Sequence, residues 1–310
     1  MAEITAKLVK ELRELTGSGM MDCKKALVAV EGDIDKAADW LRENGILKAA
    51  KKSSRIAAEG LVRTKFNEDH TEAAIVEVNS ETDFVAKNDE FVGFVEALAK
   101  KALDKAHDTL DDFLNADFDG DGKTVKEELT EKIAKIGENM NIRRFDKMKE
   151  DGVKYVGYTH GGGRIGAIVG LKTEAAFEEI EEIGKDVAMQ IASMAPKFVS
   201  AADVAQDWLE SETKILKEAT IKELEEAGKK IEMAENIVKG KINKELKEVC
   251  LTEQKFVKDA ELTVKKYVEE AAKKLGKPVE IVSMKRYEVG EGLEKKEEDF
   301  AAEVAAQMNK

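Results

Sequence analysis

A stretch rich in lysine and glutamate, residues 203–248, most constrains how this chain can fold. Its apolar residues recur at a spacing that places them on one face of a helix, while the charged residues stay in water. Gly228 and the lysines beside it supply a turn within the stretch. The pattern predicts a helical hairpin, in which two antiparallel helices close along a thin apolar seam. The seam residues are Leu209, Leu216, Leu224, Ile231, Val238, Ile242, Leu246 and Val249.

Helix is also expected to dominate the rest of the chain. Only two prolines, Pro196 and Pro278, interrupt 310 residues, and aromatic residues make up only 5% of them, which argues against an all-β sandwich. Apolar periodicity predicts helices over residues 5–16, 20–30, 34–43, 89–106, 124–137, 176–195, 261–275 and 297–308. Alternating patterns predict strands over residues 72–79, 154–159, 166–173 and 279–287. The predicted fold class is therefore α+β with helix dominant.

The first forty-five residues predict a compact three-helix module. Gly17-Ser18-Gly19 is expected to end the first helix, Gly32 the second, and Asn44-Gly45 the third in a left-handed stop. Such a ubiquitin-associated-like module usually binds a partner through one face. Lys48, Lys51, Lys52 and Arg55 then form a basic linker that is expected to be helical.

Composition excludes several classes of protein. A net charge of −13 opposes the counterion release that supplies most nucleic-acid affinity, so no direct nucleic-acid ligand is expected. Cys23 and Cys250 are too few for a disulfide framework or a four-thiolate zinc site, which favours a reducing cytoplasm. No segment approaches eighteen uninterrupted apolar residues, and the charged start of the chain lacks the apolar core of a signal peptide.

One segment matches the calcium-loop pattern D-x-D-x-D-G-x5-E. Asp117, Asp119, Asp121, Gly122 and Glu128 occupy its acidic and glycine positions. However, Thr124 stands where a branched apolar residue is expected, and the chain has no second loop of this kind. A glycine turn that leads into a helix capped by Thr124 and Glu127 accounts for the same residues without a metal, and we favour this interpretation.

A second motif, Gly161-Gly162-Gly163-Arg164-Ile165-Gly166, satisfies the dinucleotide pattern G-x-G-x-x-G. That pattern binds a pyrophosphate only when a helix begins at the glycines. Here a strand pattern follows, so the glycines are expected to turn a β-hairpin. His160 lies beside this turn and is either a structural or surface residue, or a partner contact; no histidine belongs to a recognisable nucleophile or zinc pattern.

The segment 77–91, EVNSETDFVAKNDEF, is the most informative. A predicted strand ends at Asn79, and the chain then presents Thr82, Asp83, Phe84 and Val85 before a new helix. Phe84 either plugs the local core or forms an exposed wedge, beside an acid, that inserts between helices of a partner.

Two stretches, LRELTGSGMMDCKKAL at 12–27 and EVNSETDFVAK at 77–87, resemble the signatures of the elongation factor Ts family. The likeness continues through AKIGENMNIRR at 134–144, HGGGRIG, RYEVGEGLEK and DFAAEVAAQM, so it extends over the whole chain and is weakest at 199–260. It implies five parts: a three-helix module (1–55), core subdomain N (56–140), core subdomain C (141–200 and 250–288), a coiled-coil hairpin inserted in the latter (201–249), and a C-terminal helical module (289–310).

The resemblance also implies a function without covalent catalysis or a cofactor: a guanine-nucleotide exchange factor for elongation factor Tu. The family binds the GDP form of that GTPase, disturbs its magnesium and phosphate site, and releases GDP. Asp83 and Phe84, flanked by Thr82 and Val85, match the acidic-aromatic pair that intrudes near the magnesium site. The other positions that match partner contacts are Met20, Met21, Lys24, Ile136, Gly137, His160, Phe300, Val304 and Met308.

Two other classes compete with this interpretation. The charged hairpin and the acidic loop would suit a calcium-binding or structural coiled-coil adaptor, and the glycine motif would suit a nucleotide-dependent enzyme. The resemblance leaves open whether the factor and its GTPase form a simple pair or a doubled assembly, a dimer of heterodimers, through the hairpin.

Overall fold

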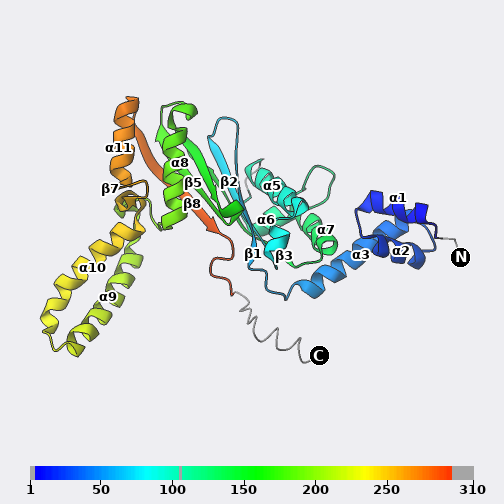
Figure 1. Cartoon of the computed structure of the whole chain (residues 1–310), viewed down its shortest axis with the longest axis horizontal. Coiled ribbons are helices and arrows are strands. Elements are labelled where there is room, and N and C mark those ends of the chain that lie inside the picture. Colours follow the sequence, from blue (N-terminus) through cyan, green and yellow to red (C-terminus); the bar gives the residue numbers. More distant parts are fainter. Residues whose placement is uncertain (1–3, 105–106, 295–310) are drawn as a thin grey trace. The chain divides into compact units, whose positions relative to one another are not determined.

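The computed structural model describes residues 4–104 and 107–294 and divides the chain into two compact units. Unit 1 contains the chain up to Lys65, Ala74–Lys147 and the segment from Tyr287 onward. Unit 2 contains Phe66–Ala73 and Met148–Arg286. Both helices and strands occur in each unit, with more residues in helix than in strand over the described ranges, which confirms the α+β prediction (Figure 1). The five-part division by residue number stays a prediction.

Unit 1 begins with the three-helix module and continues with a three-stranded sheet, order β1-β2-β3, that packs against further helices. Its elements are α1 (Ala6–Thr16), α2 (Met20–Ala29), α3 (Ile34–Lys52), β1 (Glu59–Phe66), β2 (Glu72–Ser80), α4 (Asp83–Ala86), α5 (Asp89–Asp104), α6 (Leu110–Asn115), α7 (Val125–Ile136) and β3 (Met140–Lys149).

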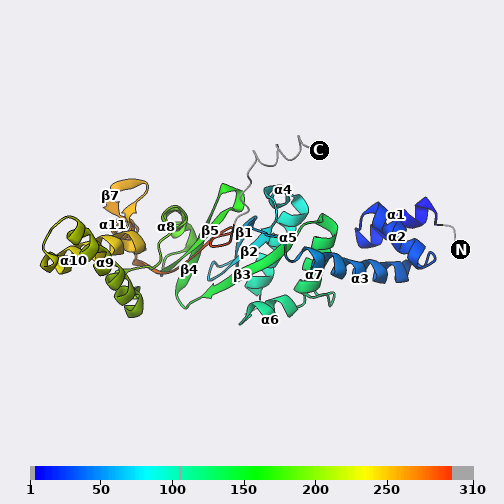
Figure 2. The same cartoon turned by 90° about the horizontal axis from the view of Figure 1, so that it is seen from below.

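Unit 2 contains a second three-stranded sheet, order β4-β5-β8, covered by α8 and α11, and a helical hairpin of α9 and α10 (Figures 1 and 2). Its strands and α-helices are β4 (Val153–His160), β5 (Ile165–Thr173), α8 (Phe177–Met194), α9 (Gln206–Glu226), α10 (Ala234–Val249), β6 (Lys255–Phe256), β7 (Asp259–Thr263), α11 (Val264–Leu275) and β8 (Val279–Glu288). Short 3-10 turns lie at Gly161–Gly163, Ala201–Asp203, Ile231–Met233 and Leu251–Glu253.

Three buried clusters hold the described residues together. In the first module, Leu12, Cys23 and Leu27 are wholly buried where α1, α2 and α3 meet. The sheet of unit 1 packs mainly against α5, with Phe91 and Leu98 at no exposure. In unit 2, strands β4, β5 and β8 pack on α8 and α11. Apolar burial of this kind is the main favourable term in folding.

Side-chain caps begin several helices as the local sequence predicts. Thr124 accepts a hydrogen bond from the Glu127 amide (3.2 Å), and Glu127 accepts one from the Thr124 amide (2.9 Å), so the capping box at α7 is confirmed. Helix α8 ends at Met194, two residues before Pro196. Gly17 and Gly276 adopt positive φ (65° and 71°) directly after α1 and α11, where a left-handed residue ends a helix.

The prediction that the third helix ends at Asn44-Gly45 is wrong. Helix α3 continues to Lys52, and Gly45 is buried within it. A Cβ added at Gly45 would lie 3.4 Å from the Ala134 Cβ of α7, so this glycine marks a close approach of two helices. The packing of α3 on α7 therefore overrides a local stop signal.

Two other expectations are wrong, and two strands were not predicted. Residues 261–263 belong to strand β7, and helix α11 begins only at Val264, after Thr263. Ile231 does not lie in the seam of the hairpin, because it is 48% exposed in the 3-10 turn before α10. Strands β1 and β3 were not predicted; in β3, half of the residues are charged and no clean alternation of apolar and polar residues appears.

The hairpin itself forms as predicted. Helices α9 and α10 lie side by side in both views, and Gly228 takes a positive φ of 64° in the turn between them (Figures 1 and 2). Leu224, Val238 and Val249 are buried in the seam. No helix of the described residues is both long enough and apolar enough to cross a bilayer.

Candidate functional site

Among the described residues, Phe84 has the most exposed large apolar side chain. It is 81% exposed on the four-residue helix α4, whereas its neighbour Val85 is 8% exposed and packs into the core of unit 1. The alternative that Phe84 plugs the local core is therefore wrong. Exposing a whole aromatic ring to water is unfavourable, and a partner that covers the ring removes this cost. The position of Phe84 therefore fits a contact surface.

Helix α4 is too short to be stable by itself, and polar contacts at its start hold it in place. Thr82 is its N-cap and accepts a hydrogen bond from the Val85 amide at 3.4 Å. Thr82 also donates twice to the carboxylate of Glu138, through its amide (3.0 Å) and its hydroxyl (2.8 Å). Glu138 therefore fixes the turn that presents Phe84.

The contact between Thr82 and Glu138 brings two predicted site segments together, residues 82–85 and residues 136–137. Ile136 ends α7 and is half-buried against the core, and Gly137 takes a left-handed φ of 91° directly after it. The Gly137 carbonyl accepts a hydrogen bond from Lys52 Nζ at 2.5 Å. Burial of this ammonium, together with the nearby charge of Arg55, lowers the pKa of Lys52. Residues 136–138 and residues 82–85 thus form one local structure.

Asp83, beside Phe84, pairs with a lysine on the surface. Its Oδ2 atom lies 2.6 Å from Lys87 Nζ; the lysine side chain is exposed and the aspartate side chain is about half-exposed. Ion pairs at the surface contribute little stability, roughly 0.2–1 kcal/mol, so breaking the pair between Asp83 and Lys87 costs little.

Sequence reasoning missed the residues that support this turn. Besides Glu138, Glu81 accepts a hydrogen bond from the Asn139 amide at 2.6 Å and lies 3.4 Å from an Arg55 nitrogen. Asn139 in turn donates to the Arg55 carbonyl at 2.8 Å. In the sequence, only the positions of Glu81 next to TDFV and of Glu138 and Asn139 within AKIGEN pointed to these residues, because the partners in each contact are far apart along the chain.

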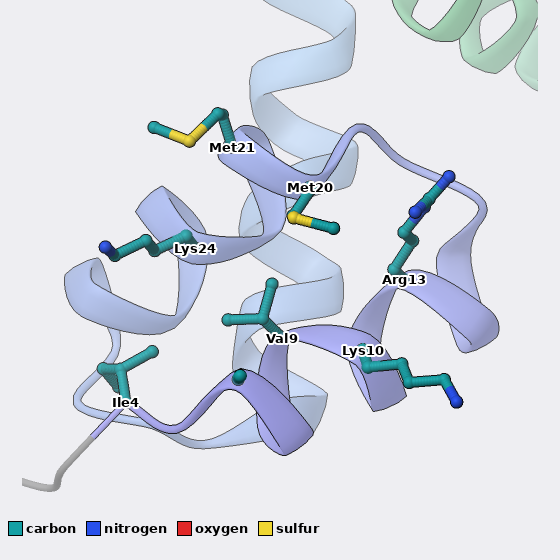
Figure 3. Close-up of a pocket in the computed structure, with 8 residues that line it drawn as sticks. Ile4, Val9, Lys10, Arg13, Met20, Met21 and Lys24 are labelled. Carbon is teal, nitrogen blue, oxygen red and sulfur yellow. The ribbon is translucent and has the colours of Figure 1, made fainter.

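Met20, Met21 and Lys24 lie on the first turns of α2, beside α1. Met20 and Met21 are 58% and 64% exposed, and Lys24 is also exposed. They line an open hollow of about 350 Å³ together with Ile4, Ala6, Val9, Lys10 and Arg13. Figure 3 shows Val9 and Met20 pointing into the space between the two helices. The hollow has an apolar floor and cationic side chains at its rim, which suits an amphipathic acidic helix.

His160 belongs to unit 2. It is exposed at the end of β4, and its Nδ1 atom lies 3.1 Å from the Tyr158 hydroxyl. Strand β4 pairs antiparallel with β5, with His160 opposite Ile165, and the glycines between them form a 3-10 turn. The hairpin prediction is confirmed. Because a strand follows the glycines and not a helix, the dinucleotide interpretation is wrong.

The carboxylates of the acidic loop before α7 accept hydrogen bonds from nearby backbone amides or pair with nearby lysines. Asp117 accepts hydrogen bonds from the Gly120 and Gly122 amides, and Asp121 accepts one from the Lys123 amide at 2.8 Å. Glu128 pairs with lysines at positions 123 and 132. Asp119 accepts from the Asp121 amide at 3.4 Å. Within residues 4–104 and 107–294, no three acidic, histidine or cysteine side chains gather as ligands of one cation would.

Three predicted contacts, Phe300, Val304 and Met308, lie outside the described residues.

Comparison with known proteins identifies the family of this chain. Residues 81–291 match the family model "Elongation factor TS", a range that begins immediately before Thr82 and includes His160. The chain is 50% identical over 308 residues to elongation factor Ts of Clostridioides difficile, covering 99% of this chain and 100% of that protein. The chain belongs to the elongation factor Ts family. This protein is therefore a translation elongation factor, with a role in protein biosynthesis.

Other elongation factor Ts proteins match over nearly the same length. That of Clostridium perfringens strain SM101 is 49% identical over 302 residues, covering 97% of this chain and 98% of that protein. That of Clostridium kluyveri is 49% identical over 306 residues, covering 98% and 99%. The family assignment thus extends over the three-helix module and the hairpin as well as the core.

Proposed function

We propose that this elongation factor Ts protein accelerates the release of GDP from elongation factor Tu by binding alone, with no bond made or broken. The observation that carries the proposal is the 81% exposure of Phe84 on a turn held from both sides, by Thr82 with Glu138 and by the buried Val85. A ring presented in this way is pre-organised for insertion, since its turn needs no reordering when the partner arrives.

Asp83 would add a charge beside the inserted ring, near the partner's magnesium and phosphate groups. A negative charge placed there repels the phosphates and competes for the cation. Thermodynamic linkage completes the mechanism: if this factor binds the nucleotide-free GTPase more tightly than the GDP form, it weakens GDP binding by the same free energy.

The hollow between α1 and α2 would provide a separate contact to the GTPase through Met20, Met21 and Lys24. His160 would supply a contact from unit 2, and Phe300, Val304 and Met308, spaced by four, a contact from the end of the chain. Whether the complex doubles through the α9–α10 hairpin stays a prediction, as do the absence of a direct nucleic-acid ligand and the cytoplasmic location.

The test is stopped-flow release of a fluorescent GDP from elongation factor Tu at fixed magnesium. Wild-type protein should accelerate release. With Phe84→Ala, release should be about tenfold slower or more than with wild type, because truncating an aromatic anchor that becomes buried in a complex typically costs about 2 kcal/mol of binding. Asp83→Asn should slow release to a lesser degree, since it keeps the shape of the side chain and removes only the charge.

A matched control is Val257→Ala, which removes an exposed apolar side chain (43% exposed) from the β6–β7 turn. It should leave the rate unchanged. If wild-type protein fails to accelerate release, or if Phe84→Ala releases GDP as fast as wild type, the proposal is wrong and the structural adaptor becomes the leading interpretation.

A further inference from the structure

The end of helix α3 is fixed to the segment that supports the Phe84 turn. Lys52, the last residue of α3, is half-buried, and its Nζ atom donates to the Gly137 carbonyl at 2.5 Å. A Cβ added at Gly137 would lie 3.7 Å from the same nitrogen, so the ammonium covers this residue closely. Burying even part of a charge is unfavourable unless an acceptor compensates it, and this carbonyl does so.

A cation suits the place where Lys52 lies. Helix α7 ends at Ile136, and Gly137 follows it with its left-handed φ. Carbonyls at the end of a helix lack a partner within the helix and carry partial negative charge, so a lysine there both satisfies an acceptor and stabilises the helix end. The nearby carboxylates of Glu81 and Glu138 favour the ammonium as well.

The contact continues to the exposed ring through the residues that follow Gly137. The next residue is Glu138, whose carboxylate accepts from the amide and the hydroxyl of Thr82. Asn139 comes after it, and its side chain donates to the Arg55 carbonyl at 2.8 Å. This segment is therefore bonded on one side to the end of α3 and the turn after it, and on the other side to the start of α4.

The carbonyl that Lys52 binds belongs to the planar peptide group that joins Gly137 to Glu138. Glycine restricts its own backbone least of all residues, so the contacts of this group decide its orientation. We propose that Lys52 is a positioning residue for nucleotide exchange: by fixing this peptide group it orients Glu138, which in turn holds the turn that presents Phe84. The inference rests on the proposed function.

Three substitutions isolate this contact. Lys52→Met keeps the apolar stem of the side chain and removes the ammonium, whereas Lys52→Arg keeps a cationic donor. Lys147→Met is the matched control, because Lys147 is also half-buried and its Nζ atom donates to a carbonyl at a helix end, that of Leu103 in the last turn of α5, at 2.5 Å.

Hydrogen–deuterium exchange of the full chain without a partner tests whether Lys52 holds the turn. Lys52→Met should make the amides of residues 82–88 exchange about threefold faster, the effect expected from losing one hydrogen bond beneath the turn. Lys52→Arg should restore most of the protection, and Lys147→Met should leave these amides at the wild-type rate. Wild-type protection of residues 82–88 in Lys52→Met would overturn the inference.

The release of fluorescent GDP from elongation factor Tu tests whether this positioning matters for exchange. With Lys52→Met, release should be about threefold slower than with wild type, and with Lys52→Arg or Lys147→Met it should be close to wild type. In the Phe84→Ala background, Lys52→Met should slow release no further, because the ring that it positions is gone. With Met21→Ala, which alters the hollow of the three-helix module, the two effects should multiply.

The same measurements show how the inference fails. Full slowing by Lys52→Met in the Phe84→Ala background would mean that Lys52 acts on stability and not through the ring. Slowing that disappears in the Met21→Ala background would mean that Lys52 places the three-helix module instead, and unchanged release with Lys52→Met would deny it any part in exchange. If wild-type protein does not accelerate release, the proposed function fails, and hydrogen–deuterium exchange still decides whether Lys52 holds the turn.

Discussion

At the scale of single residues, the presentation of Phe84 depends on one hydroxyl and one carboxylate. Thr82 Oγ1 accepts from the Val85 amide and donates to Glu138, so it satisfies a helix end and links two segments that lie 56 residues apart. A four-residue helix has almost no stability of its own. The position of the exposed ring is therefore decided by polar contacts that lie beneath it.

Replacing Thr82 with valine removes the hydroxyl and keeps the shape. We expect Thr82→Val to lower the free energy of unfolding by about 1 kcal/mol, the usual cost of losing an N-cap, and to slow GDP release. Thr109→Val is the matched control, because Thr109 caps α6 by the same contact with the Asp112 amide (3.1 Å) away from this turn. Urea unfolding should show similar losses of stability for the two variants. GDP release should be slowed only by Thr82→Val. Equal rates for the two variants would contradict the role of this cap.

At the scale of elements, the glycines differ in what their backbone requires. Gly45 lies inside α3, whereas Gly276 ends α11 at a positive φ of 71°, and a Cβ added at Gly276 would meet no atom within 4 Å. Only the second position favours glycine on conformational grounds.

Alanine at these two positions should have opposite effects. Gly45→Ala should stabilise the protein by about 0.5–1 kcal/mol through helix propensity, because the added methyl group meets Ala134 at contact distance. Gly276→Ala should destabilise it by about 1 kcal/mol, since alanine is strained in the left-handed region. Thermal unfolding followed by circular dichroism measures both. A loss of stability for Gly45→Ala would show that α3 and α7 are packed too closely to accept a methyl group.

The α9–α10 hairpin contributes nothing to the main core of unit 2. None of the buried residues of that core lies between Ala205 and Leu246, and the base of the hairpin is tied by backbone bonds such as Lys197 N to Val249 O (2.8 Å). Joining Ala205 to Leu246 by a short glycine-serine linker should therefore reduce the helical signal in circular dichroism but keep cooperative unfolding with a similar midpoint. Loss of cooperativity would mean that the hairpin is required for folding.

At the scale of the whole molecule, both units contain a tyrosine whose ionisation opposes folding. In unit 2, burial and the nearby charge of Glu150 raise the pKa of Tyr155 to about 12. In unit 1, burial and a hydrogen bond to Asp146 raise the pKa of Tyr287. A raised pKa means that the folded state holds the phenolic proton more tightly than the unfolded state does.

Stability should therefore be complete below the ordinary tyrosine pKa of about 10 and fall as pH rises from about 10 to 12. Urea unfolding across this range, with tyrosinate absorbance as the second signal, measures the loss. Tyr287→Phe should be less stable at neutral pH, because the hydrogen bond from the Tyr287 hydroxyl to Asp146 is lost, but it should show a weaker dependence on alkaline pH. An equal pH dependence for wild type and Tyr287→Phe would contradict this assignment.

The parts of the fold that the sequence predicts correctly depend on contacts between near neighbours. The capping box of Thr124 and Glu127, the glycine turn between β4 and β5, and the end of α8 before Pro196 each involve residues within a few positions of one another. The family resemblance carried by residues 77–87 and 134–144 is likewise readable from the chain alone. Local chemistry and family membership were thus determined by the sequence itself.

Only the tertiary structure decided the features that join distant segments. It showed that Gly45 continues a helix because α7 lies against it, that Phe84 is exposed while Val85 is buried, and that Glu138 holds Thr82. The clearest case is Glu77, whose carboxylate accepts a hydrogen bond from the Gly290 amide, 213 positions away. Such contacts leave no periodic signal in the sequence, because their free energy comes from burial and pairing that exist only once the chain has folded.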